Sequence, residues 1–259
     1  MDADVIVVGG GPAGAMAAHA LAQAGVKVLL FEMARFPRHK PCGGSLSPKV
    51  LSLDVDFDEV VEDVVMEATF TAPGEAPIEY RAKSPLAYMV QRERFDQLLL
   101  NRAQETGVRA LFGHRVLRAK EISEGVEVFS DRGPFRAPVL VGADGAHGAV
   151  TRSFSRSPSR IALAMDVRIA LPDDAQDVWN GKVLIDFGAI PFGYGWVFPK
   201  AREASTGVLA VKKKVRGLPG HLDRFLDQHA SLMGTRRVSG WPIPLPAWSL
   251  KSVATSRVL

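Results

Sequence analysis

Cysteine is almost absent from this sequence of 259 residues, in which Cys42 is the only one. A single thiol excludes an internal disulfide, and it excludes a four-cysteine iron–sulfur cluster or zinc site. The six histidines are scattered and show no spacing typical of metal ligands. We therefore predict a protein without a metal that resides in the reducing cytoplasm.

Long apolar runs are absent as well. No segment reaches the roughly 18 consecutive apolar residues of a membrane-spanning helix. The alanine-rich N-terminal stretch carries Asp2 and Asp4 in place of a basic leader, which argues against a secretory signal. The basic residues are not interleaved with aromatic residues, so we expect no nucleic-acid partner.

Two basic clusters accompany the net charge of +4. The first lies within residues 35–40, and the second contains Lys212, Lys213, Lys214 and Arg216. A solvated face is one interpretation of the second cluster, and attraction to an anionic lipid surface or a substrate phosphate is the other. Peripheral contact with the inner face of a membrane is therefore one expected interaction.

The N-terminal residues have the pattern of a dinucleotide-binding βαβ unit. Residues 5–8 predict a strand, residues 13–24 a helix and residues 26–31 a second strand. In this pattern the glycines form a tight turn and let the backbone approach a pyrophosphate at the helix start, while an acid after the second strand accepts from ribose hydroxyls. The candidate cofactor-binding residues are Gly9, Gly11, Pro12, Ala13, Gly14 and Glu32.

Beyond this unit the pattern alternates between α/β and β-rich segments, which indicates two intertwined domains. Helices are expected over residues 56–64, 95–103 and 218–229, with strands between them. The dinucleotide-binding domain is expected to contain residues 1–60, 91–158 and 246–259. The β-rich domain is expected to contain residues 61–90 and 159–245.

Four further motifs follow in order. Residues 40–44 read K-P-C-G-G, residues 92–96 fit R-x-x-F-D, residues 142–145 read G-A-D-G, and residues 191–199 fit P-x-x-Y-x-W-x-F-P at every fixed position. With these motifs the chain resembles the geranylgeranyl reductase family. The resemblance implies a p-hydroxybenzoate hydroxylase-like α/β fold, in which a Rossmann-type FAD-binding domain is intertwined with a β-rich substrate domain. It also implies FAD as cofactor, NAD(P)H or reduced ferredoxin as electron donor, and a prenylated, lipid-like substrate.

Two features depart from the family pattern. Gly148 stands where the D-G motif usually continues to serine, which removes one polar contact near the flavin phosphates. The family's second flavin motif, G-D-A-A-G, follows a strand similar to residues 256–259, at which this sequence stops. A truncated or split flavoprotein with weakened FAD binding is therefore expected.

An isolated alkene has no carbonyl to polarise it, so its reduction requires an acid and electron-rich walls around the developing charge. Cys42 is the candidate acid, because a thiol is mostly protonated at neutral pH; a small residue that merely fits its loop is the alternative. Tyr194 and Trp196 share one face of a predicted strand and, with Phe198, would line the prenyl pocket and stabilise positive charge. Core packing is the alternative for these rings, and Phe192 is expected to share their face.

The remaining candidate residues take their roles from the resemblance. Gly43 and Gly44 would let backbone amides approach the flavin ring. Arg92, just before the helix expected near residue 95, would reach a flavin phosphate. Asp144 and Gly145 would orient the pyrophosphate. Arg35 and Lys40 are candidates for attracting a substrate diphosphate, with solvated side chains as the alternative.

Three functions stay open. The first is an FAD-dependent reductase of isoprenoid carbon–carbon double bonds in a lipid, quinone or pigment precursor. The second is a flavin-dependent monooxygenase or halogenase of the same fold, although a halogenase would show W-x-W-x-I-P where this sequence has Y-x-W-x-F-P. The third is a non-catalytic remnant, or half of a split flavoprotein.

Overall fold

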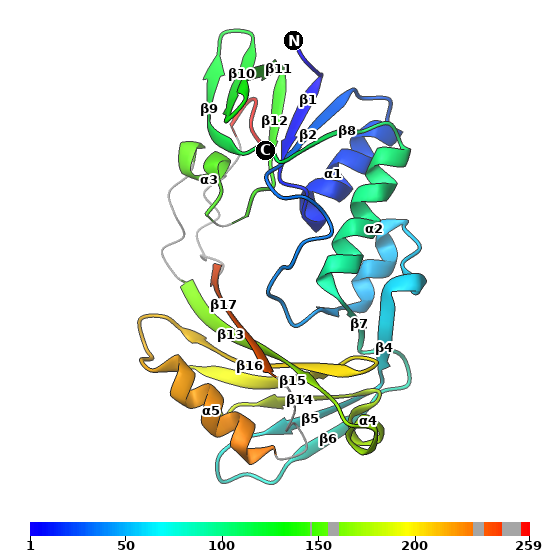
Figure 1. Cartoon of the computed structure of the whole chain (residues 1–259), viewed down its shortest axis with the longest axis vertical. Helices are drawn as coiled ribbons and strands as arrows, with labels where there is room; N and C mark the ends of the chain where they lie inside the picture. The colour runs from blue at the N-terminus through cyan, green and yellow to red at the C-terminus, as the bar shows by residue number, and fades with distance from the viewer. Residues whose placement is uncertain (146, 155–160, 230–235, 245–254) are drawn as a thin grey trace. The chain divides into compact units, whose positions relative to one another are not determined.

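The computed structural model describes residues 1–145, 147–154, 161–229, 236–244 and 255–259 (Figure 1). The chain forms two compact units. Unit 1 contains Met1–His39, Glu93–Ser159 and Ala247–Leu259. Unit 2 contains Lys40–Arg92 and Arg160–Pro246.

The units are interleaved along the chain, but one boundary differs from the expected one. Residues 40–60 belong to unit 2, whereas the sequence pattern assigned them to the dinucleotide-binding domain. The reason is that β3 (Ser45–Leu46) pairs with β7 (Ala87–Val90), which lies in unit 2. The expected boundaries at 158–159 and 245–246 lie outside the described residues.

Unit 1 is built on a four-stranded parallel sheet of order β12-β1-β2-β8. Its strands are β1 (Val5–Val8), β2 (Val28–Glu32), β8 (Arg109–Phe112) and β12 (Val139–Gly142). Every residue of β1 and β2 is buried, because a parallel sheet is covered on both faces. Between these strands runs helix α1 (Pro12–Gln23), so the expected βαβ unit is present within two residues of its predicted bounds.

The other elements of unit 1 complete its layers. Helix α2 (Arg92–Glu105) buries its leucines, and α3 (Ala149–Phe154) follows β12. An antiparallel sheet contains β9 (Val116–Ile122), β10 (Gly125–Ser130) and β11 (Gly133–Ala137). Ile6 and Phe31 of the parallel sheet share a buried cluster with Val126 and Val128 of β10, so this second sheet covers one face of the first.

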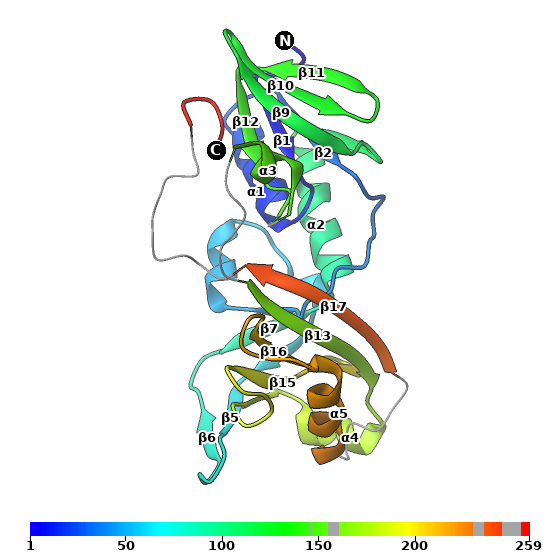
Figure 2. The same ribbon diagram turned by 90° about the vertical axis from the view of Figure 1, so that its left-hand side faces the viewer.

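Unit 2 contains a seven-stranded sheet of order β17-β13-β16-β15-β14-β5-β6. Its strands are β5 (Glu67–Thr71), β6 (Ile78–Arg81), β13 (Ile161–Ala170), β14 (Lys182–Asp186), β15 (Gly193–Pro199), β16 (Glu203–Val211) and β17 (Arg236–Pro244). Strands β13 and β17 run side by side over their length (Figure 2). A smaller sheet is formed by β3, β7 and β4 (Val61–Val65).

Two elements of unit 2 differ from the expected ones. The helix expected over residues 56–64 is wrong: a single 3-10 turn (Asp58–Val60) leads directly into β4. The β-branched valines of this segment favour a strand, and pairing with β7 satisfies their backbone. Conversely, residues 173–179 form helix α4 (Asp173–Trp179) in a region expected to be mostly β. A further 3-10 segment occupies Pro48–Leu53.

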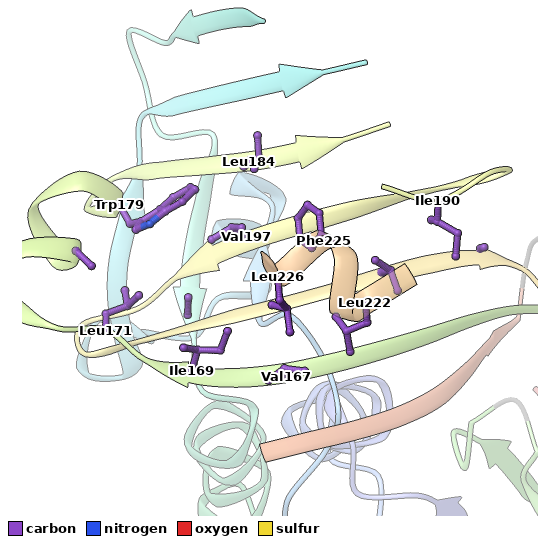
Figure 3. Packing of buried hydrophobic residues seen from close by; sticks show 14 residues of the cluster. Val167, Ile169, Leu171, Trp179, Leu184, Ile190, Val197, Leu222, Phe225 and Leu226 are labelled. Atoms are coloured by element: carbon purple, nitrogen blue, oxygen red, sulfur yellow. The ribbon is translucent and has the colours of Figure 1, made fainter. Parts of the chain in front are cut away.

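Helix α5 (Leu218–Gln228) covers one face of the seven-stranded sheet and confirms the helix expected there. Leu222, Phe225 and Leu226 of α5 lie over the sheet residues Val167 and Val197 in a single buried cluster (Figure 3). Because side chains alternate along a strand, the neighbours of Val197 in β15 point to the other face. The face without α5 therefore carries the aromatic residues of β15.

No helix among the described residues is both long enough and apolar enough to cross a lipid bilayer. The same residues contain no group of three or more histidine, cysteine or acidic side chains arranged to hold a metal ion.

Gly195→Ala should destabilise unit 2 by about 1–3 kcal/mol, as overpacking does. A methyl group at Gly195 would lie 2.8 Å from Cε2 of Phe225 and 2.7 Å from Cβ of Ala189. Gly220→Ala is the matched control, because the nearest atom to its added methyl is 3.8 Å away on Arg224. The control should be neutral or stabilising by up to about 1 kcal/mol. Urea unfolding of both variants measures the difference, and equal effects would contradict the close packing of α5.

Candidate functional site

The loop between β1 and α1 is shaped by two glycines. Gly9 has φ +105°, and a methyl group there would overlap the carbonyl oxygen of Ala143. A methyl group at Gly14 would overlap the carbonyl oxygen of Gly9. Gly11 is the N-cap residue of α1, which opens with Pro12 and Ala13. The strand end and the helix start therefore lie as close together as the fingerprint requires.

Glu32 at the end of β2 is buried, and both of its carboxylate oxygens are held. Oε2 accepts from the amide of Gly10 at 2.8 Å, and Oε1 accepts from the amide of Ala34 at 2.8 Å. Each oxygen retains a lone pair, so the carboxylate can accept further hydrogen bonds from hydroxyl groups. It lines a cavity of about 170 Å³ together with Gly9 and Asp144. Three predicted cofactor-binding residues from distant parts of the sequence thus share one cavity.

Arg38 belongs to the first basic cluster, within residues 35–40, but the sequence analysis gave it no role at the cofactor. Its Nη1 lies 3.1 Å from Oδ2 of the fully buried Asp96, and its guanidinium lies 4.6 Å from the ring centre of Phe36. Its Nη2 is 3.6 Å from the position that a Cβ of Gly11 would occupy. The guanidinium is therefore held at the start of α1, where a cation and a helix N-terminus together favour a phosphate. The signal in the sequence was Asp96 of R-x-x-F-D, but only the fold shows its partner.

Asp144 turns toward the start of α3. Its Oδ2 accepts from the amide of Val150 at 2.9 Å. Burial raises the pKa of Asp144, and the hydrogen bond from Val150 acts in the opposite direction. A methyl group at Gly148 would overlap this carboxylate. Gly148, at which the sequence departs from the family pattern, therefore leaves the space that the Asp144 side chain occupies. Gly145, the residue after Asp144, adopts φ +82°.

Unit 2 contains an apolar cavity of about 240 Å³ on the face of the sheet opposite α5. Its walls are Pro41, Cys42, Gly43, Ala164, Tyr194, Trp196, Phe198, Leu209 and Ile243. The structure therefore brings the thiol and the three predicted aromatic residues together around one space. The exception is Phe192, which was expected to share their face but does not line this cavity, because it adopts φ +54° before β15 begins.

The rings along β15 pack in sequence. The centres of the Tyr194 and Trp196 rings are 6.2 Å apart, and those of Trp196 and Phe198 are 6.1 Å apart. Gly207 on β16 leaves room for the indole, since a methyl group there would lie 2.6 Å from Cη2 of Trp196. A methyl group at Gly43 would lie 2.6 Å from Cδ2 of Phe198. Burial raises the pKa of Tyr194, which keeps its hydroxyl neutral.

A chain of buried polar side chains holds the indole of Trp196. Nε1 of Trp196 donates to Oγ of Ser205 at 3.4 Å, and the Ser205 hydroxyl donates to Oδ1 of Asp166. Ser205 and Asp166 are both buried. A buried carboxylate that accepts from a hydroxyl strengthens that hydrogen bond and fixes its direction. The orientation of Trp196 toward the cavity is thus set by residues on β13 and β16.

Lys200 is a second residue that the sequence analysis missed. It is only 5% exposed, and its Nζ donates to the carbonyl oxygen of Gly43 at 2.9 Å. Burial lowers the pKa of Lys200, while the charges of Asp166 and Glu203 raise it. Gly44, at φ +71°, approaches the carbonyl of Val90 so closely that a methyl group would overlap it. The loop that carries Cys42 is therefore tied to the end of β15.

The remaining candidates are more dispersed. Arg92 was expected to lie just before a helix that begins near residue 95. Helix α2 begins at Arg92 itself, so Arg92 is its first residue. Arg35 lines a separate cavity of unit 1 with Phe36 and Phe112, and Lys40 belongs to unit 2. The roles given to these residues stay predictions.

A glycine-shaped loop before a helix, a held acid after the second strand and a cation at the helix start define a dinucleotide-binding fold. Residues 2–185 match the FAD binding domain family. The chain therefore belongs to that family.

Curated relatives and solved structures agree with this assignment. The chain is 32% identical to geranylgeranyl diphosphate reductase of Rhodobacter capsulatus, covering 80% of this chain and 54% of the relative. It is 30% identical to menaquinone reductase of Mycobacterium tuberculosis, covering 83% and 56%. These values confirm the resemblance drawn from the motifs. The chain spans about half the length of the curated relatives it matches.

Two solved structures share the fold. A geranylgeranyl bacteriochlorophyll reductase-like protein of Thermoplasma acidophilum superposes with a TM-score of 0.83 at 25% identity, covering 93% of this chain and 66% of the other. The halogenase PltM superposes with a TM-score of 0.76 at 16% identity, covering 94% and 60%. The predicted fold class, an FAD-binding domain intertwined with a β-rich domain, is confirmed.

Arg38→Ala should raise the dissociation constant for FAD by about 10-fold or more, since charge-assisted hydrogen bonds contribute about 1.5–3 kcal/mol. Arg35→Ala is the control, because that arginine of the same loop lines a different cavity and should change the affinity little. Titration of flavin fluorescence measures both constants. Equal affinities in the two variants would show that Arg38 does not face the cofactor.

Lys200→Met should change how stability depends on pH. Because the pKa of Lys200 is lowered from 10.5, the unfolded chain binds this proton more tightly, and wild-type stability gains as pH rises toward 10.5. The variant has no group that titrates at this position, so its stability should not rise in this way. The free energy of unfolding of the wild type minus that of the variant should therefore increase as the pH becomes alkaline. Urea unfolding across the alkaline range tests this, with Lys49→Met, at an exposed lysine, as control. Parallel curves for wild type and Lys200→Met would disprove it.

Proposed function

We propose that the chain is the cofactor-binding and substrate-binding part of an FAD-dependent reductase that saturates isoprenoid carbon–carbon double bonds. The substrate class is a prenylated lipid, quinone or pigment precursor. The observation that carries the proposal is the apolar cavity of unit 2, in which the only thiol of the sequence lies with three aromatic residues of one strand. Two curated relatives that are named as reductases support it.

The residues of unit 1 fit the cofactor. Gly9 and Gly14 leave backbone where side chains would otherwise stand, and Glu32 is held with acceptor capacity to spare. Arg38 supplies positive charge at the start of α1. When bound, reduced FAD supplies a hydride. The reducing equivalents would come from NAD(P)H or reduced ferredoxin.

In this proposal the residues of unit 2 supply the proton and bind the alkene. Saturation of an alkene adds one hydride and one proton, and Cys42 is the proton donor in this proposal because its thiol lines the cavity. Tyr194 and Trp196 present π-faces that stabilise positive charge on the alkene carbons. The bond from Trp196 to Ser205 holds the indole in this orientation. The apolar walls exclude water, which would otherwise capture a carbocation.

A halogenase or monooxygenase is the competing activity, and it is favoured by the similarity to PltM. At 16% identity this similarity concerns the fold alone. Tyr194 and Phe198 stand where the halogenase pattern has tryptophan and isoleucine, and the reductase motif is complete. The reductase is therefore the better supported activity.

The requirement for oxygen distinguishes the two activities, because a monooxygenase or halogenase needs oxygen and an alkene reductase does not. The purified protein is supplied with FAD and dithionite under strict anaerobiosis and incubated with a geranylgeranyl lipid. A reductase yields a product heavier by two hydrogens for each double bond, whereas a monooxygenase or halogenase yields none without oxygen. A protein that takes up no FAD, and remains colourless, supports the non-catalytic alternative.

Cys42→Ala should abolish or strongly reduce alkene saturation while the rate of flavin reduction stays unchanged. General acid catalysis is worth about 10²–10⁴-fold, so a loss of that size is expected in single-turnover product formation. Ala164→Ser, at another residue that lines the cavity, is the control for a change in the wall. Normal saturation in Cys42→Ala would remove the thiol from the mechanism.

A further inference from the structure

The loop between β14 and β15, residues 187–192, exposes two aromatic rings. Phe187 is 54% exposed and Phe192 is 66% exposed, and they stand at the two ends of the loop. Between them Ile190 is only 1% exposed and packs in the core beneath α5 (Figure 3). The loop is therefore anchored by one buried side chain while both rings face solvent.

The backbone at Phe192 adopts an unfavourable conformation. Its φ of +54° lies in the left-handed region, which is strained for a residue other than glycine. The carbonyl oxygen of Phe192 accepts from the amide of Val211 at 3.2 Å, so the turn is tied to the end of β16.

Three lysines follow the end of β16 next to this turn. Lys212, Lys213 and Lys214 are all exposed, and Nζ of Lys214 lies 5.4 Å from the ring centre of Phe192. No salt bridge joins any of the three to an acid within the described part of the chain. Exposed ammonium groups and exposed aromatic rings thus share one end of the seven-stranded sheet. We call this set, Phe187, Phe192 and Lys212 to Lys214, the basic–aromatic surface.

We propose that the basic–aromatic surface docks on an anionic lipid bilayer. Aromatic rings enter the boundary between headgroups and acyl chains, and lysines bind the lipid phosphates above them. Each lysine near an anionic membrane contributes about a fivefold gain in binding. An acidic protein would match the charge, but it would leave two solvent-facing rings on a strained loop without a partner. The bilayer accounts for the charge and the rings together.

Docking would also bring lipids to the cavity of unit 2. The ring centre of Phe187 is 6.5 Å from that of Tyr194, and Tyr194 lines the cavity. A row of aromatic rings therefore continues from the basic–aromatic surface to Trp196 and Phe198. A prenyl chain could leave the bilayer along this row. This last step rests on the proposed function, whereas the docking itself does not.

The test is co-sedimentation of the purified protein with vesicles of phosphatidylcholine, with and without added phosphatidylglycerol. Binding should require phosphatidylglycerol and weaken as salt is raised. Replacing Lys212, Lys213 and Lys214 by alanine should lower the partition coefficient about 100-fold. Phe192→Asn should lower it about 10-fold, and asparagine tolerates the left-handed backbone, so the fold should be retained.

Matched control variants test whether vesicle binding depends on this surface or on exposed charge and exposed aromatic rings in general. Alanine at Lys27, Arg109 and Arg132, three exposed basic residues of unit 1, should leave vesicle binding within about twofold. Tyr80→Thr removes a ring that is 54% exposed on β6 and should also leave it unchanged. FAD uptake is measured on every variant, so a failure of docking is distinguished from a failure of the proposed function. Absence of vesicle binding, equal losses in the control variants, or binding to an acidic protein alone would overturn the proposal.

Discussion

The close approach of the Cys42 loop to strand β15 is the constraint on which the substrate side of this protein depends. Residue 43 has no side chain, so the loop backbone lies directly against the ring of Phe198. Lys200 then holds the carbonyl of Gly43 from the end of the same strand. A bulkier loop would be displaced from the rings, and the thiol would be displaced with it. The cavity of unit 2 exists because backbone takes the place of a side chain at this point.

The two units solve different physical problems. Unit 1 fixes polar groups, since Glu32 is held by two amides and Arg38 by the buried Asp96, which suits a charged and hydroxyl-rich cofactor. Unit 2 offers an apolar cavity, and its buried Ser205 and Asp166 hold the ring of Trp196 in the cavity wall. The match to the FAD binding domain family accounts for the first, and the proposed prenyl substrate accounts for the second.

The sequence allowed some elements to be predicted much better than others. The βαβ start and α5 have strong apolar patterns and clear glycine signals, and both were placed within two residues. The helix expected over residues 56–64 was wrong because the valines there are paired with β7, a strand that lies beyond them in the sequence. Phe192 was misplaced for a related reason. Alternation holds only inside a strand, and the left-handed turn at residue 192 precedes the strand.

The sequence by itself determined the cofactor class and the residues that could carry the chemistry, because the spacing of Gly9, Gly11 and Glu32 and the motif around Trp196 are local patterns. Only the tertiary structure decided which residues support them. Arg38 and Lys200 look like ordinary surface cations in the sequence, yet each is held by a partner 58 or 157 positions away, namely Asp96 and Gly43. Such pairings arise from the folding of distant segments onto one another, and no local pattern encodes them.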